Sequence, residues 1–90
     1  MGLANAEATV RLPDGVALHA RPAGLFVRTA AGFRSRVTVV AGPKQADAKS
    51  ILAVMALGAE GGASLVLRAE GEDAEAAVAA LASCVAGFAE

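Results

Sequence analysis

Hydrophobic residues recur at two different spacings along this chain of 90 residues, and each spacing predicts a kind of secondary structure. Residues 6–12 alternate between apolar and polar side chains, which is the pattern of a half-buried strand. Residues 35–40 and 64–70 predict two further strands that contain valine or leucine at their centres. The polar segment 44–47 predicts a short edge strand, where its lysine discourages aggregation. The chain is therefore expected to form four strands.

The stretch after the first strand has the spacing of a helix. Pro22 suits the first position of a helix because its missing N–H would have no helical partner there. Apolar residues then recur three and four positions apart and form one buried stripe, made of Ala23, Phe26, Val27 and Ala30. Gly32 is expected to end this helix.

Two more helices are expected, each after a residue that favours a helix N-terminus. Ser50 is a good N-cap for a short helix that runs to about Leu57. Asp73 is expected to cap the last helix. The apolar stripe of that last helix consists of Val78, Leu81, Val85 and Phe88.

The predicted order of elements is β-α-β-β-α-β-α, which indicates an α+β fold. Four strands and three helices in so short a chain favour two layers, with the helices covering one face of a sheet. Ninety residues are enough for a single domain, 1–90, and for one hydrophobic core. We do not expect a domain of this size to enclose a deep catalytic cavity of its own.

Charge changes the picture only through its distribution. The net charge is −1, so nothing global indicates a nucleic-acid partner. Residues 1–50 carry seven Arg and Lys against three acidic residues, whereas residues 51–90 carry one against six. The only histidine lies in the basic half. This asymmetry is either ordinary scatter or the mark of a face that meets an anion or an acidic partner.

The cysteine content and the terminal sequence bear on the compartment. Cys84 is the only cysteine, so no disulfide can form within the chain, and we expect it to be inert and partly buried in the last helix. The first ten residues lack the basic start and the apolar core of a signal peptide, and the apolar runs are too short to span a membrane. We therefore expect a cytoplasmic protein without membrane insertion.

One short segment, Leu18-His19-Ala20-Arg21-Pro22, combines groups that could carry chemistry. A helix N-terminus exposes unpaired N–H groups and binds anions, and the guanidinium of Arg21 adds a second ligand for phosphate. These positive groups favour the neutral, nucleophilic form of the His19 imidazole. On this local argument alone, His19 could equally be a surface residue that caps the helix and does nothing more.

The complete sequence favours a chemical role for His19, because it resembles the histidine-containing phosphocarrier protein (HPr) family of the bacterial phosphotransferase system. The resemblance covers roughly residues 7–88 and rests on three motifs, LHARPAGLFV at 18–27, AKSILAVMALGAEGG at 48–62 and AEGEDAEAAV at 69–78. The family fold is an open-faced sandwich, in which three helices cover one face of a four-stranded antiparallel sheet. Its order of elements agrees with the one predicted above.

The resemblance implies a role for each residue of the first motif. His19 corresponds to the residue that is phosphorylated on a ring nitrogen, Nδ1 in this family, and Arg21 to the partner that steadies the phosphoryl group. The phosphoryl group would come from phosphorylated enzyme I and pass to enzyme II A components that serve sugar transport. The chain would be a covalent carrier rather than a turnover enzyme, and would need no cofactor and no metal.

The second motif places Ser50 at a position that is phosphorylated in many Gram-positive members of the family. Its local role as a helix cap is independent of that resemblance. The resemblance implies HPr kinase/phosphorylase as a further partner, and a phosphate here would add about two negative charges to the docking face. Such charges should repel an acidic enzyme I surface and slow the phosphorylation of His19.

The same resemblance implies a docking surface on the first two helices. An apolar patch with a basic rim suits a transient, partly acidic partner, and a monomer suits a carrier that presents one face to successive partners. The expected docking residues are Leu25, Arg28, Lys49, Ile51, Leu52 and Met55, with Arg21 at the rim. For any single apolar residue the alternative is core packing, and for Arg28 it is a solvated surface position.

Two departures from the family pattern lie beside His19. The loop after Pro13 is longer by about two residues, and Ala17 stands where glycine commonly precedes the Leu-His pair. Either change could loosen the loop or alter how it presents the imidazole. They leave two alternatives open: a specialised homologue serving nitrogen control or a dihydroxyacetone pathway, and a regulatory binding module without phosphoryl transfer.

Overall fold

The computed structural model describes residues 4–88 and contains the predicted elements in the predicted order. They are β1 (Asn5–Arg11), α1 (Ala20–Ala31), β2 (Arg36–Ala41), β3 (Lys44–Asp47), α2 (Ile51–Ala56), β4 (Ser64–Glu70) and α3 (Ala74–Gly87). The bounds of all four strands lie within one residue of those expected. Three of the strands, β1, β2 and β4, are well predicted because they contain valine or leucine between clear turn signals.

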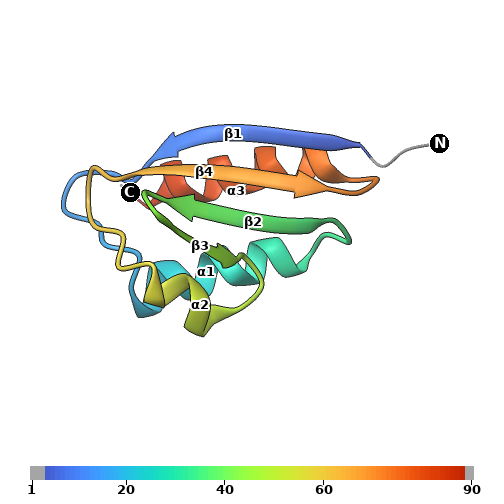
Figure 1. Ribbon diagram of the computed structural model, residues 1–90. Helices are drawn as coiled ribbons and strands as arrows, with labels where there is room; N and C mark the ends of the chain where they lie inside the picture. The colour runs from blue at the N-terminus through green and yellow to red at the C-terminus, as the bar shows by residue number, and fades with distance from the viewer. Residues whose placement is uncertain (1–3, 89–90) are drawn as a thin grey trace.

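The strands form one antiparallel sheet in the order β1-β4-β2-β3 (Figure 1). The last strand of the chain therefore lies in the middle, with β1 on one side and β2 on the other. One row across the sheet runs from Thr9 through Val66 to Val40, and in it Thr9 is exposed while Val66 and Val40 are half-buried. Pairing over the whole of β4 leaves β1 and β3 as the two edges.

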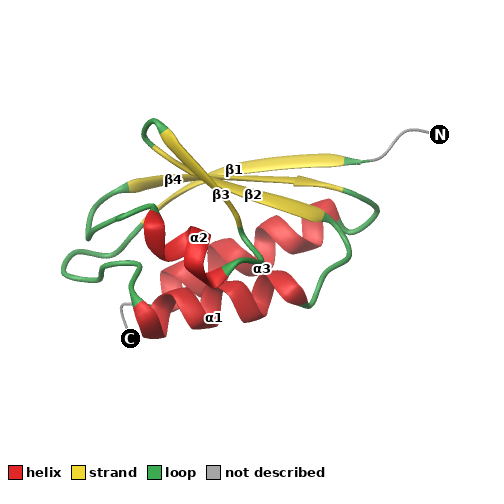
Figure 2. Cartoon of the chain, turned by 60° about the horizontal axis from the view of Figure 1, so that its bottom comes forward, coloured by secondary structure: helices red, strands yellow, loops and turns green. Residues whose placement is uncertain are grey.

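All three helices cover the same face of the sheet, and the opposite face is open (Figure 2). The core fills the space between the two layers, because alternate residues of each strand and one stripe of each helix point into it. Its largest fully buried side chains are Phe26, Leu12, Leu18, Leu65, Leu67 and Leu81. The chain thus has the predicted α+β open-faced sandwich.

The first helix begins two residues earlier than Pro22. His19 is the N-cap with extended backbone, and its carbonyl accepts a hydrogen bond from the amide of Ala23 at 2.7 Å. Pro22 thus occupies the third helical position, where its missing N–H is still without a helical acceptor. The consequence is that His19 lies directly at the mouth of the helix.

Asp73 is the N-cap of α3, as predicted, but it caps the helix through its backbone carbonyl, which accepts from the Ala77 amide at 2.9 Å. Asp73 precedes α3, but its carboxylate makes no capping hydrogen bond to that helix. It instead accepts hydrogen bonds from the backbone amides of Arg34 and Ser35, both at 2.9 Å, and from the Ser35 hydroxyl. The Ser35 hydroxyl, followed by the Arg34 amide, holds the pKa of Asp73 below its ordinary value. Asp73 therefore fastens α3 to the segment between α1 and β2.

Candidate functional site

The imidazole of His19 is exposed and free. His19 makes no side-chain capping bond, and within residues 4–88 its ring has no hydrogen-bond or ion-pair partner. The amides of Ala20 and Arg21 follow it in the first turn, where helix geometry leaves N–H groups without an intrahelical acceptor. An anion held on the His19 ring would therefore meet unpaired donors and the positive end of the helix dipole.

Arg21 lies in the same first turn and is also exposed. In the part of the chain that the structure describes, the ion pairs are Arg11–Asp14 and Arg68–Glu7, so the Arg21 guanidinium is not engaged by a carboxylate. No acidic residue stands in the first turn of α1 to compete for it. The two residues that the sequence singled out are thus brought together at one helix end, with both side chains available to a ligand.

The loop before His19 is anchored to the loop that follows α2. The Leu12 amide donates to the Ala63 carbonyl and the Leu18 amide to the Ala59 carbonyl, each at 2.9 Å. Leu18 is fully buried, so the residue preceding His19 is fixed in the core. Residues 13–17, which include Ala17, therefore lie between two fixed points and do not detach the histidine from the fold.

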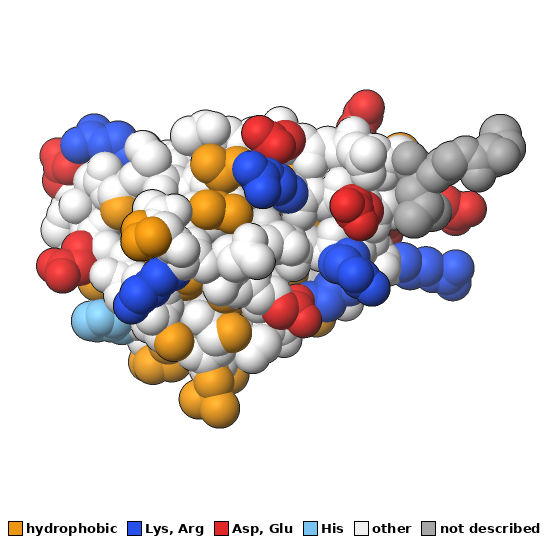
Figure 3. All heavy atoms as spheres, in the orientation of Figure 1, with side chains coloured by type: hydrophobic (Ala, Val, Ile, Leu, Met, Phe, Trp, Pro, Cys, Tyr) orange, Lys and Arg blue, Asp and Glu red, His pale blue; other side chains and the backbone are white. Residues whose placement is uncertain are grey.

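Exposed apolar side chains gather beside this helix end. Leu25 is 44% exposed, and α2 contributes Ile51 at 42%, Leu52 at 79% and Met55 at 37%. We call these four residues the apolar patch. In Figure 3 the pale blue histidine lies at the edge of the molecule, near orange side chains that gather over α1 and α2. An apolar patch of this kind on a surface is typical of a protein-docking site.

Arg28 and Lys49, the two basic residues expected at the rim of the apolar patch, lie toward the opposite end of α1 from His19. Arg28 is exposed in the last turn of α1. The Lys49 Nζ atom donates to the Phe33 carbonyl at 2.7 Å, just beyond the end of α1. A helix of 12 residues is about 18 Å long, so Lys49 is near the opposite end of α1 from His19. The structure thus gives Lys49 a role in holding the chain after α1.

Ser50 has the local role that the sequence predicts. It is the N-cap of α2, and its hydroxyl oxygen accepts a hydrogen bond from the Ala53 amide at 3.3 Å. The residue is half-buried and is followed directly by Ile51 of the apolar patch. A charge added at Ser50 would therefore lie beside that patch.

Two further findings concern ligands and membranes. Within residues 4–88, no three His, Cys, Asp or Glu side chains are grouped so that they could hold a metal ion. The helices described here include none with the length and apolar character needed to cross a membrane.

Comparison with known proteins identifies the family. The family model described as "PTS HPr component phosphorylation site" matches residues 5–87. The phosphocarrier protein HPr of Streptomyces coelicolor is 45% identical over 82 residues, covering 90% of this chain and 88% of the relative. That of Mycoplasma capricolum is 40% identical over 70 residues, covering 78% and 79%. The chain therefore belongs to the HPr family of phosphocarrier proteins of the phosphotransferase system.

Solved structures agree with this assignment. An HPr from Thermoanaerobacter tengcongensis superposes with a TM-score of 0.89 at 42% identity, covering 94% of this chain and 97% of that one. A structure described as an HPr dimer from the same organism gives a TM-score of 0.74 at 41% identity, covering 90% and 93%. These matches confirm the fold, and the second shows that an HPr can be found as a dimer.

The sequence alone did not reveal three long-range polar contacts of the fold. The bond between Lys49 and Phe33 joins residues 16 apart, the Ser35–Asp73 contact joins residues 38 apart, and the Arg11–Gly62 contact joins residues 51 apart. No local pattern marks such pairs. Covariation across an alignment is the signal that could identify them.

Proposed function

We propose that this chain accepts one phosphoryl group on His19 from phosphorylated enzyme I and transfers it to an enzyme II A component. The observation that carries the proposal is the free, exposed His19 imidazole at the N-terminus of α1, with the Arg21 guanidinium in the same turn. In the transfer a lone pair on a His19 ring nitrogen forms the new N–P bond while the bond between phosphorus and enzyme I breaks. Passing the group on reverses these roles, so the chain is regenerated and serves as a carrier.

Arg21 and the first-turn amides support the transfer step. Phosphohistidine carries negative oxygens, and helix N-termini and guanidinium groups are among the best protein ligands for such oxygens. Their exposure also suits the chemistry, because the phosphoryl group must be reached by two different partners in succession. The apolar patch provides a surface on which each partner can dock transiently. The carrier we propose acts in the cytoplasm as a monomer.

Intact-mass measurement tests the assignment of His19. The protein is mixed with phosphoenolpyruvate, magnesium and enzyme I, and we expect a gain of one phosphoryl group that is labile to acid and stable to alkali. The gain should be absent in His19→Ala and should persist in Ser50→Ala. A gain that survives His19→Ala would overturn the proposal. A protein that binds enzyme I but gains no mass would instead be a regulatory binding module.

We also propose that phosphorylation of Ser50 by an HPr kinase/phosphorylase regulates the transfer. Ser50 lies at an N-terminus, where phosphate is tolerated, and is adjacent to Ile51 in the apolar patch. About two added negative charges would oppose docking of an acidic partner. Ser50→Asp should therefore raise the KM of enzyme I for this chain as its substrate. Ser50→Asn introduces a neutral cap of the same size as aspartate and should not raise it. Equal kinetics in the two variants would refute regulation through charge.

A further inference from the structure

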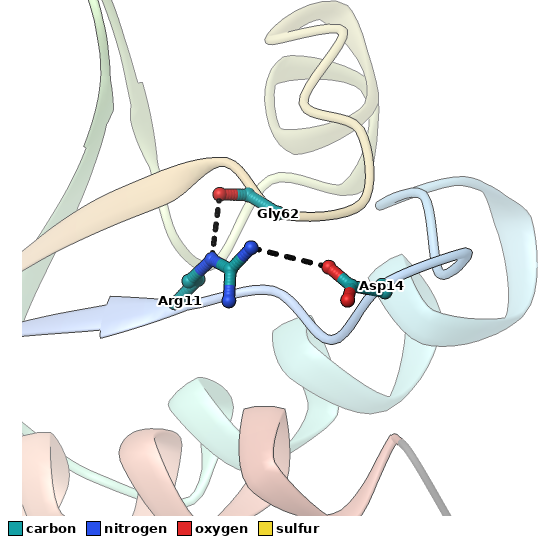
Figure 4. A network of polar contacts seen from close by, with 3 residues as sticks. All are labelled: Arg11, Asp14 and Gly62. Carbon is teal, nitrogen blue, oxygen red and sulfur yellow. Dashed lines mark hydrogen bonds and ion pairs between the residues drawn. The ribbon is translucent and has the colours of Figure 1, made fainter.

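The side chain of Arg11 bridges two loops at the end of the sheet that leads to His19. Its Nε atom donates a hydrogen bond to the Gly62 carbonyl at 3.1 Å, and its Nη2 atom lies 3.2 Å from Oδ1 of Asp14 (Figure 4). Asp14 belongs to the loop that precedes His19, and Gly62 belongs to the loop that follows α2. One guanidinium therefore joins the histidine loop to a segment that is about fifty residues away in sequence.

The two loops also touch each other directly. A Cβ atom on Gly61 would lie 2.5 Å from the Gly15 amide nitrogen and 3.1 Å from the Pro13 carbonyl oxygen. Only glycine allows this approach, because real side chains are not found so close to another backbone. The contact means that residues 13–15 rest against the second loop and do not extend freely into solvent.

Within residues 4–88, backbone bonds join the histidine loop (residues 12–18) to the second loop (residues 57–63) only at the two ends of the histidine loop. They join Leu12 to Gly62 and Ala63, and Leu18 to Ala59. Between these anchors the described backbone bond is Val16 to Pro13 at 3.1 Å, which lies within the loop itself. The Arg11–Asp14 contact is therefore the side-chain bond, among residues 4–88, that ties the middle of the loop to the rest of the fold.

We propose that Arg11 is a positioning residue for phosphoryl transfer: it holds the middle of the histidine loop against Gly62 and so supports the buried Leu18 anchor, from which the chain enters α1. The inference rests on the proposed function of His19. Its consequence is that the His19 ring keeps one orientation relative to the first-turn amides and Arg21. A contact in the middle of the loop matters because the residues between two anchors otherwise keep conformational freedom.

Because the Arg11–Asp14 contact is exposed, its effect on the position of the loop can be distinguished from its effect on the stability of the whole domain. The Arg11 and Asp14 side chains are 67% and 86% exposed. An ion pair so open to water adds little to the stability of the whole domain, but it restricts a segment that has few other contacts. Its loss should therefore change the loop and the histidine much more than the melting temperature.

A matched pair of variants tests this. Arg11→Met removes the bridge, and Arg68→Met is the control, because Arg68 forms a similar exposed pair with Glu7 at 3.2 Å on the sheet, away from the loop. In Arg11→Met we expect kcat for phosphorylation by enzyme I to fall about fivefold with KM unchanged, since the apolar patch is intact. Arg11→Lys, which can reach one of the two partners, should restore part of the rate. Arg68→Met should match the wild type.

Two measurements without enzyme I keep the test independent of the proposed function. In Arg11→Met the NMR signals of the His19 ring should shift and broaden, and the Val16 amide should exchange about twofold to fivefold faster than in the wild type. Unchanged ring signals and unchanged exchange would overturn the positioning role, whatever happens to the rate. Equal losses in Arg11→Met and Arg68→Met would also overturn it. A wild-type protein that gains no phosphoryl group on His19 would refute the proposed function, while the ring signals would still report on Arg11.

Discussion

The two ends of α1 are built in opposite ways. At its N-terminus, His19 caps the helix through its backbone alone, and the side chains of His19 and Arg21 stay exposed. At the other end, Lys49 donates to the Phe33 carbonyl, and Asp73 accepts from the Arg34 and Ser35 amides and the Ser35 hydroxyl. Polar groups are left open at one end and are satisfied at the other.

This difference separates chemistry from stability within one helix. Open donors can bind a transferred group, but they contribute little to the fold because water already satisfies them. Satisfied and half-buried donors hold α1, β2 and α3 together, but they are not available to a ligand. Substitutions at the N-terminal end should therefore change phosphoryl transfer, and substitutions at the C-terminal end should change the free energy of unfolding.

The largest expected effect is on the free energy of unfolding, at the C-terminal end of α1. Gly71 has a φ of +148°, and a Cβ atom there would lie 2.5 Å from the Ser35 hydroxyl oxygen. Gly71→Ala should lower the free energy of unfolding by about 3 kcal/mol, through backbone strain and displacement of Ser35. The control is Gly42→Ala, which has a φ of +59° with nothing within 4 Å and should cost about 1 kcal/mol. Urea denaturation compares them, and equal losses would contradict a special role for the Ser35 contact.

At the N-terminal end of α1 the expected effect is on the rate of phosphoryl transfer. Arg21→Glu replaces the proposed phosphate ligand by a charge that repels phosphate, and transfer to His19 should slow on the order of a hundredfold. Because Arg21 is exposed, the free energy of unfolding should change by less than about 0.5 kcal/mol. Rapid-quench kinetics and urea denaturation measure the two quantities on one preparation. A loss of stability that accounts for the loss of rate would remove the distinction between the two ends.

Ser35→Ala should have a smaller effect, confined to stability. Ser35 is 1% exposed, and its hydroxyl donates to Asp73. Losing this one hydrogen bond while both backbone amides still donate should cost about 1 kcal/mol. The rate of His19 phosphorylation by enzyme I, measured below the unfolding transition, should not change. A slower transfer would mean that contacts at the C-terminal end of α1 also affect the site at His19.

The same contact predicts a pH dependence. The pKa of Asp73 is held below its ordinary value of 3.8, chiefly by the Ser35 hydroxyl, so the folded state favours the carboxylate. The resulting stabilisation is present above the unfolded value and is lost as the pH falls through the lower folded value. Urea midpoints measured from about pH 6 down to about pH 2 should fall less steeply at the acidic end in Ser35→Ala than in the wild type. Parallel curves would show that Ser35 is not the main cause.

The smallest expected effect is a gain in stability inside α1. Gly24 is an interior helical residue, and a Cβ atom there would meet Cδ1 of Ile51 at 4.0 Å, an ordinary van der Waals contact. Gly24→Ala should therefore stabilise the fold by about 0.5–1 kcal/mol, because alanine has less backbone freedom to lose. Thermal denaturation tests the sign. A decrease in stability would indicate that α2 cannot tolerate even one methyl group against α1.

Local sequence was sufficient for the elements and for the candidate site. The alternation in 6–12, the apolar centre of 64–70, the spacing of Phe26 and Ala30, and the cap at Ser50 are all properties of neighbouring residues, and the structure confirms them. The same holds for the placement of His19 and Arg21 in one turn, since two residues of separation at a helix start keep them together. The family comparison supports the motif that contains them.

Tertiary structure decided which distant polar groups meet. The sequence by itself placed Asp73 before a helix, but folding brought Ser35 and the Arg34 amide to its carboxylate and so diverted that carboxylate from capping. It likewise carried the amine of Lys49 to the Phe33 carbonyl, just beyond the end of α1. The physical reason is that strand order, β1-β4-β2-β3, is set by how the whole apolar surface is buried, and a side chain finds its partner only after that order exists.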